Sequence, residues 1–358
     1  MGRKDYKIVI AILIYCFALS CKKDSTTVGS TPFVDSENVY TICEGMLGNG
    51  DASLYLYHTS DKGVFGDIYK TANNQSLGDI FQSMTQIGNN FFLCINNSDK
   101  IIVINKTDWK QVNVISVPKP RYILSISPTK AYVSTLFSNK VYIINPQTFL
   151  VTGAIDMPHK NPEGMLLYNN AAYICTWDTT TNNVYKLDIN TDKITDSFPV
   201  SGYAPQEIML DKEQKLWILS GNHSNNKPAA FTRVDPASKS MMTSFLFAPD
   251  IDPIRPILNN TEDTVYFIEA NYSGGTTNNG VYRMNIHDGS LPATAFIPAQ
   301  LNQYFYAVGI EPITGNIYIG DPKGFTQKGS VYVYKTDGTI VSQFNVGVGP
   351  GHFYFYHQ

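Results

Sequence analysis

The segment KVYIIN at residues 140–145 is the unit that decides the fold, because six related segments occur along the chain. They are SLYLYH at 53–58, KIIVIN at 100–105, NVYKLD at 183–188, AFTRVD at 230–235, GVYRMN at 280–285 and SVYVYK at 330–335. Successive copies are 40 to 50 residues apart. A repeat of this length containing several strands is typical of a β-propeller. The sequence therefore predicts an all-β chain of seven repeats.

Each repeat contains three further strand patterns around this segment. Before it comes an apolar strand such as AAYICTW (171–177) or TVYFIEA (264–270), and before that a first strand such as GMLLYN (164–169). After it come a polar turn and a fourth strand such as ITDSFPV (194–200). The connections contain Gly, Asn and Asp, which tolerate tight turns. We therefore predict four-stranded blades and a seven-bladed β-propeller.

The two ends of the repeat array complement each other. The first copy, from Asn38 to Tyr69, has three strands and lacks the first one. The C-terminal stretch VGPGHFYFYHQ (348–358) supplies one unpaired strand that resembles the missing one. Pairing the two segments would close the ring and remove exposed sheet edges. Residues 38–358 are therefore predicted to form one propeller domain.

Composition narrows the classes of partner. Aromatic residues make up 13% of the chain and charged residues 16%, and the net charge is −3. Such a chain has no basic excess, so its composition does not favour binding to nucleic acid or to an anionic membrane surface. A hydrophobic content of 43% also argues against disorder.

The N-terminal segment resembles an export signal. Arg3, Lys4 and Lys7 precede an apolar stretch at 8–19, which is too short to span a bilayer and fits the hydrophobic part of a signal peptide. The following ALSC (18–21) resembles a bacterial lipobox, which predicts a signal peptide at 1–20 and lipidation of Cys21. An ordinary signal peptide is the alternative. Residues 21–37 are expected to be a flexible tether. We expect outer-membrane anchoring by lipid only, with exposure at the cell surface.

Three cysteines remain after this segment: Cys43, Cys94 and Cys175. Their odd number argues against a complete disulfide framework. Cys94 and Cys175 occupy matching places in the repeat, where other copies have Ser134, Ser220 and Gly320. A small buried side chain packed against the next blade explains this position.

One face of the propeller is predicted to be functional. The connections between blades and the loops between second and third strands share that face, and they are rich in aromatic, amide and charged residues, whereas the opposite face has short polar turns. Aromatic rings and orienting polar groups suit a large, partly polar ligand. Packing between blades is the alternative role for any one of these side chains. The candidate ligand-binding residues are Phe81, Gln82, Arg121, Tyr122, Glu163, Trp177, Tyr203, Gln206, Glu207, His223, Arg255, Tyr272, Tyr304, Phe305, Phe325 and His352.

The sequence contains no local motif for catalysis. It lacks HExxH, GxSxG and a phosphate-binding glycine loop. His352 with Glu163 or Glu207 is the one grouping that imitates the His/Glu pair of metal-dependent propeller lyases. We therefore expect neither a resident cofactor nor a metal, and a lyase or hydrolase is the weakest alternative.

The repeat strands, such as SNKVYIINPQTFLVTGAI (138–155), resemble those of YncE-like propellers. The segment from Asn38 is also similar to the start of a family of Bacteroidota propeller lipoproteins with the pattern E-G-x-x-G-x-G-x-x-S-L, here Glu44 to Leu54. That family includes surface lipoproteins that capture cobalamin and related corrinoids and pass them to a TonB-dependent outer-membrane transporter. The resemblance implies a non-catalytic corrinoid-binding protein. A protein-interaction or glycan-binding scaffold is the alternative.

Overall fold

The computed structural model describes residues 38–270 and 279–356. The predicted signal peptide, the tether with Cys21, and Tyr272 lie outside the described residues. Within the described ranges, none of the helices has the length and hydrophobicity needed to cross a membrane.

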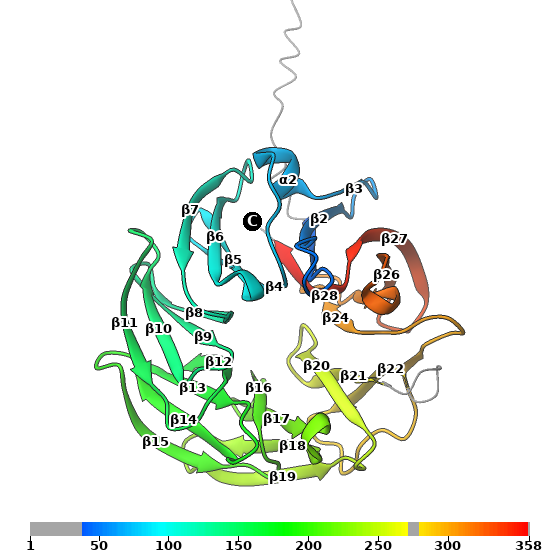
Figure 1. The fold of residues 1–358 in the computed structure, drawn as a ribbon. Helices are drawn as coiled ribbons and strands as arrows, with labels where there is room; N and C mark the ends of the chain where they lie inside the picture. Colours follow the sequence, from blue (N-terminus) through cyan, green and yellow to red (C-terminus); the bar gives the residue numbers. More distant parts are fainter. Residues whose placement is uncertain (1–37, 271–278, 357–358) are drawn as a thin grey trace, which may run out of the picture. The chain divides into compact units, whose positions relative to one another are not determined.

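Seven four-stranded antiparallel sheets form a ring, which confirms the predicted propeller. In Figure 1 the innermost strands β4, β8, β12, β16, β20 and β28 surround the centre of the ring. We number the blades along the chain. Blade 1 consists of β28 (Pro350–Tyr356), β1 (Asn38–Cys43), β2 (Ser53–His58) and β3 (Val64–Phe65), from the inside outwards.

The other blades follow the chain from the inner to the outer strand. Blade 2 consists of β4 (Phe81–Ile87), β5 (Asn90–Ile95), β6 (Lys100–Asn105) and β7 (Gln111–Ser116). Blade 3 consists of β8 (Pro120–Ser127), β9 (Lys130–Thr135), β10 (Lys140–Asn145) and β11 (Leu150–Asp156). Blade 4 consists of β12 (Pro162–Tyr168), β13 (Ala171–Thr176), β14 (Asn183–Asp188) and β15 (Lys193–Pro199).

The last three blades have the same order. Blade 5 consists of β16 (Pro205–Leu210), β17 (Leu216–Asn222), β18 (Lys227–Asp235) and β19 (Ser240–Leu246). Blade 6 consists of β20 (Asp252–Leu258), β21 (Thr264–Ala270), β22 (Gly280–Asn285) and β23 (Ile297–Pro298). Blade 7 consists of β24 (Ala307–Ile310), β25 (Ile317–Asp321), β26 (Lys328–Tyr334) and β27 (Ile340–Val348).

The C-terminal strand closes the ring as predicted. β28 pairs with β1 in an antiparallel register that sets Tyr354 opposite Tyr40 and Tyr356 opposite Asn38. The β28 side chains also reach both neighbouring blades, because Phe353 packs near Tyr318 of β25 and Tyr354 packs near Phe91 of β5. The last strand of the chain therefore connects three blades.

Blade 1 differs from the prediction at its outer edge. The expected fourth strand up to Tyr69 is shortened to β3, and a helix, α2 (Ile68–Asn73), follows it. The Asp67 side chain caps this helix by accepting a hydrogen bond from the backbone N–H of Lys70. Tyr69 is fully buried and donates from its hydroxyl to Gln111 of β7. The helix thereby covers the short outer strand against blade 2.

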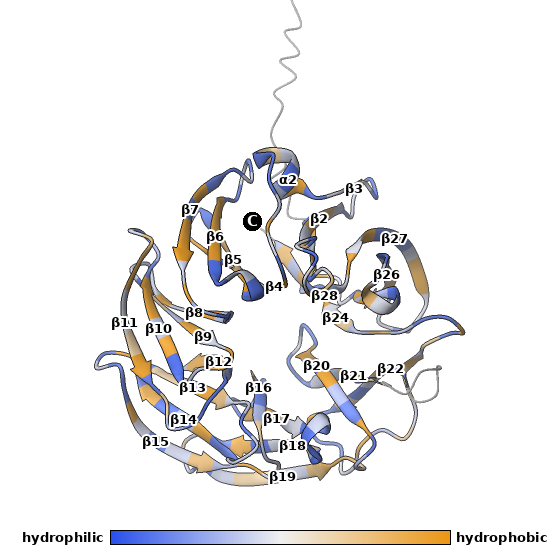
Figure 2. Cartoon of the chain, in the orientation of Figure 1, coloured by the Kyte–Doolittle hydropathy of each residue, from blue (hydrophilic) through white to orange (hydrophobic). Residues whose placement is uncertain are grey.

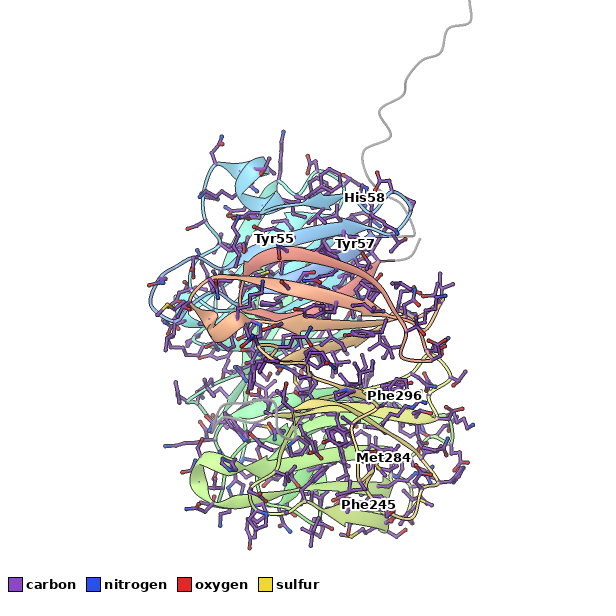
Figure 3. All side chains as sticks on the ribbon, turned by 90° about the vertical axis from the view of Figure 1, so that its right-hand side faces the viewer. Tyr55, Tyr57, His58, Phe245, Met284 and Phe296 are labelled. Carbon is purple, nitrogen blue, oxygen red and sulfur yellow. The ribbon has the colours of Figure 1, made fainter. Side chains whose placement is uncertain are left out.

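The hydrophobic core lies between neighbouring blades. Phe92 and Val103 of blade 2 pack in one cluster with Val133 and Ile144 of blade 3. Further clusters join blades 3 to 7 pairwise, and one joins blade 7 to blade 1. Figure 2 shows hydrophobic colour along β6 and β10, as their alternating sequences predict. Figure 3 labels Phe245 of β19 and Met284 of β22, which belong to the cluster between blades 5 and 6.

The cysteine prediction is confirmed for the described part of the chain. Cys43, Cys94 and Cys175 are free and buried. Ser134 and Ser220, at the places that match Cys94 and Cys175, are also fully buried. At the matching Gly320, an added Cβ atom would lie 2.8 Å from the backbone oxygen of Pro350. Packing against the next blade therefore limits the size of this side chain.

Candidate functional site

The inner strands begin around an axial cavity of about 310 Å³. In five blades, the residue immediately before the inner strand has a positive φ angle: Ile80, Lys119, Asn161, Ala204 and Gly349. This conformation is uncommon for residues other than glycine, and its repetition shows that the chain must turn sharply at this point. Hydrogen bonds fix the turn, because the carbonyls of Ile80 and Asn161 accept from the N–H groups of Asn96 and Trp177 at 2.7 Å.

The start of the inner strand is irregular in most blades. The pairing register shifts between Phe81 and Ser83 in blade 2 and between Pro205 and Glu207 in blade 5, with related shifts in blades 1, 3, 4 and 6. A β-bulge re-aims side chains out of the regular alternation. Neighbouring residues such as Arg121 and Tyr122, or Gln206 and Glu207, therefore both line the cavity.

These two neighbouring positions combine large and small residues from blade to blade. Where the first residue is large, as in Glu163-Gly164, the second is small, and the order is reversed in Gly351-His352. A Cβ atom on Gly164 would lie 2.6 Å from the backbone oxygen of Gln206, and one on Gly351 would lie 2.2 Å from Oε1 of Glu44. Crowding around the axis therefore decides which position carries the functional side chain.

Arg121 is the centre of the first polar group in the cavity. Its Nε donates to both carboxylate oxygens of Glu163, at 2.9 and 3.0 Å, and its Nη1 donates to Gln82. The Gln82 amide in turn donates to the Tyr122 hydroxyl at 3.2 Å. Glu163 has a side chain that is only 4% exposed, so the ion pair is largely shielded from solvent. Burial raises the pKa of Tyr122, and the nearby carboxylates raise it further. The group joins blades 2, 3 and 4.

Arg255 is the centre of the second polar group. Its Nη2 donates to Glu44 at 2.8 Å and to the Tyr306 hydroxyl at 3.1 Å, and its Nη1 lies 2.8 Å from Nε2 of His352. Burial, followed by the charges of Arg255 and Arg121, holds the pKa of His352 well below its usual value, so this imidazole is neutral at neutral pH. Its Nε2 therefore accepts from Arg255. The group joins blades 1, 6 and 7.

The backbone of Arg255 is itself unusual. Its φ angle is 55°, and it lies between Pro253 and Pro256 where the pairing of β20 is interrupted. A left-handed conformation in a bulky residue costs about 1–3 kcal/mol and persists where the surroundings enforce it. Here the contacts with Glu44, Tyr306 and His352 hold the side chain in place, which indicates that its position has a purpose beyond packing.

The structure brings together most, but not all, of the sequence-predicted site residues. The cavity is lined by Gln82, Arg121, Tyr122, Glu163, Trp177, Gln206, Glu207, His223 and Arg255. His352 contacts Arg255 and packs edge-on near Tyr122. Phe325 packs edge-on near the cavity residue Tyr306.

Four predicted residues lie elsewhere. Phe81 and Phe305 are fully buried and do not line the cavity, because the two positions that follow each of them turn towards the axis instead. Phe305 belongs to the core between blades 6 and 7. Tyr203 is 47% exposed with Lys227 over its ring, outside the cavity lining. Tyr304 is also outside this lining, and its hydroxyl is buried without a hydrogen-bond partner.

The cavity also includes residues that sequence reasoning did not select: Glu44, Asp252 and Tyr306. Glu44 opens the loop after β1, at the place that Trp177 holds in blade 4, since both follow a second strand directly. Tyr306 follows Phe305 as Gln82 follows Phe81. Aligning the repeats position by position would have selected both residues.

Comparison with known proteins is consistent with this fold. A family described as a domain of unknown function, DUF5074, matches residues 37–356. The chain belongs to the DUF5074 family. No curated protein matches the sequence.

Solved structures share the propeller at low identity with this DUF5074 chain. A quinonprotein alcohol dehydrogenase-like protein from Bacteroides thetaiotaomicron has a TM-score of 0.66 at 14% identity, with 89% of this chain and 78% of that chain covered. Hydrazine synthase from Kuenenia stuttgartiensis has a TM-score of 0.60 at 13% identity, with coverage of 75% and 87%. A streptogramin B lyase has a TM-score of 0.51 at 12% identity, with coverage of 74% and 82%. These neighbours include enzymes, and at such identities they show the fold alone.

Proposed function

We propose that this chain is a non-catalytic ligand-binding lipoprotein of the cell surface whose axial cavity recognises a corrinoid and which delivers it to a TonB-dependent outer-membrane transporter. The observation that carries the binding role is the convergence of polar side chains from all seven blades on one cavity. Pockets with a few fixed polar groups and aromatic walls are suited to orienting a ligand. Both arginines are held by carboxylates, so the lining is ordered before any ligand arrives.

The choice of ligand rests on chemistry and on the resemblance of the Glu44 to Leu54 segment to corrinoid-capturing lipoproteins. A corrinoid is a broad ring whose edge carries amide groups. It is wider than the cavity, so the ring would lie over the mouth and its amide side chains would reach the polar lining. Exposed aromatic residues stand beside the mouth: Phe137 is 76% exposed and Tyr203 is 47% exposed. The backbone N–H of Phe137 donates to the side chain of Asn161, which precedes the inner strand of blade 4.

Calorimetric titration with cyanocobalamin tests this proposal. We expect one mole of ligand to bind per mole of protein without turnover. The Phe137→Ala and Tyr203→Ala variants should each weaken binding about tenfold, because each removes aromatic contact area from the ring. Ile313→Ala is the matched control, since Ile313 is 67% exposed in the turn between β24 and β25 on the opposite face. No heat with cyanocobalamin at micromolar protein would refute the choice of ligand.

The lipid anchor is tested separately, in cells supplied with a radiolabelled fatty acid. We expect wild-type protein to carry the label and to sediment with outer membranes, because the thiol of Cys21 is the predicted attachment point. Cys21→Ala should lose both properties. Cys16→Ala is the control, since this residue lies within the predicted signal peptide and should leave labelling unchanged. Labelled Cys21→Ala protein would contradict the lipobox interpretation.

A further inference from the structure

The cavity carries more negative than positive groups. Two guanidinium groups, Arg121 and Arg255, face four carboxyl groups, those of Glu44, Glu163, Glu207 and Asp252. Arg121 is already paired with Glu163, and Arg255 with Glu44. A ligand anion would have to displace a carboxylate from an arginine that it already neutralises. The lining is therefore unfavourable for phosphate or carboxylate groups.

Glu207 differs from the two paired glutamates. Its carboxylate has no hydrogen bond or ion pair with any residue in the described part of the chain, although the side chain lines the cavity. Burial and the neighbouring Glu163 raise its pKa to about 7, while the charges of Arg255 and Arg121 lower it. A buried acceptor without a partner is costly, and the cost is removed when a ligand supplies a donor.

Arg255 offers the complementary unmatched group. Both of its terminal nitrogens are engaged, but its Nε is buried without a hydrogen-bond partner. The charges of Arg255 and Glu207 interact with each other, yet the two side chains form no direct hydrogen bond. One cavity thus contains an unused acceptor on β16 and an unused donor on β20.

We propose that Glu207 and Arg255 together bind a primary carboxamide of the ligand, the amide N–H₂ donating to Glu207 and the amide oxygen accepting from Nε of Arg255. A carboxamide is the neutral group that carries a donor and an acceptor side by side. An ammonium group would satisfy Glu207 and leave Nε of Arg255 unpaired, whereas a carboxylate would face Glu207 with like charge. This inference rests on the proposed binding function and names the group that enters the cavity.

The carboxamide has two sources that the experiment separates. The peripheral amides of a corrinoid are one, and the side chain of glutamine in a peptide is the other. The corrinoid probes are cyanocobalamin and its monocarboxylic derivatives, in which one peripheral amide has been hydrolysed. The peptide probes are N-acetylglutamine methylamide and N-acetylglutamate methylamide. In each pair the amide should bind at least tenfold more tightly than the acid, for that corrinoid position which enters the cavity.

Substitutions at Glu207 separate ligand contact from structural support. Glu207→Leu should weaken binding of the amide probe at least tenfold, because the charge-assisted hydrogen bond is lost. Glu207→Gln should have a smaller effect, since its amide oxygen still accepts. The raised pKa means that ionised Glu207 opposes folding increasingly as pH rises through about 7. Glu207→Gln should therefore melt at a higher temperature than wild type at pH 8 while binding less tightly, a combination that a purely structural role does not produce.

The affinity should also depend on pH. The ionised carboxylate is the stronger acceptor, so wild-type affinity should fall severalfold between pH 8 and pH 6, whereas Glu207→Gln should not change. The groups that face Glu207 across the cavity are Glu44, Arg121, Tyr122, Glu163, His223, Asp252, Arg255, Tyr306 and His352. Glu262→Gln is the matched control, because it makes the same charge change in an exposed turn on the opposite face.

The outcomes distinguish this inference from the proposed function. If cyanocobalamin binds with an affinity that Glu207→Leu and pH leave unchanged, the carboxamide assignment is overturned and the corrinoid function stands. If only the glutamine probe binds, and Glu207→Leu weakens it, the carboxamide assignment stands and the corrinoid function fails. Absence of binding by both amide probes overturns the carboxamide assignment and the choice of ligand.

Discussion

Removal of residues 348–358 should abolish cooperative folding of the propeller. The deletion takes away β28, the inner strand of blade 1, and exposes the backbone edge of β1 that pairs with it. It also removes Phe353 and Tyr354, whose rings pack against blades 7 and 2. Truncating one buried aromatic side chain costs about 3–5 kcal/mol, and the whole stability of a domain is about 5–15 kcal/mol. An unpaired inner edge also favours aggregation.

Circular dichroism and thermal denaturation measure this effect. We expect the shortened protein to show no sharp transition and to elute as aggregates on size exclusion. A synthetic peptide of residues 348–358, supplied during refolding, should restore a monomer with a transition near that of the full chain. A shortened protein that melts within a few degrees of the full chain would show that ring closure contributes little to stability.

Replacement of Arg255 by methionine should destabilise the fold by about 3–5 kcal/mol, since it leaves Glu44 as a buried charge without its partner. Burial raises the pKa of Glu44, whereas the charges of Arg255 and Arg121 lower it. Without Arg255 this pKa rises further. A carboxyl group with a raised folded-state pKa destabilises the fold increasingly as pH rises through that pKa, so the loss should be larger at pH 8 than at pH 5.

Urea denaturation at the two pH values provides the measurement. The double variant Arg255→Met with Glu44→Gln should recover much of the lost stability at pH 8, because neither residue then carries an unpaired charge. Lys239→Met is the control, since it breaks an exposed ion pair with Asp196 and should have a small effect. Equal losses at pH 5 and pH 8, without recovery in the double variant, would show that the effect comes from packing alone.

The sequence determined the architecture because a propeller is built from local repeats. The strand unit exemplified by KVYIIN sets the blade count, and the alternation of apolar residues sets the faces that pack between blades. The unpaired C-terminal strand also predicted how the ring closes. Helix α2 was missed because it occurs once, in the segment that follows the shortened strand β3.

Only the tertiary structure decided the composition of the cavity. Glu44 and Arg255 are 211 residues apart and meet because ring closure places blade 1 beside the last blades. The register shifts at the inner strands turn Tyr306 towards the axis and leave Phe305 in the core, although the two are adjacent in sequence. Repetition in the sequence encodes the blade, but it does not encode which of two neighbouring side chains reaches the axis. That choice depends on backbone turns and on the space left by the other blades.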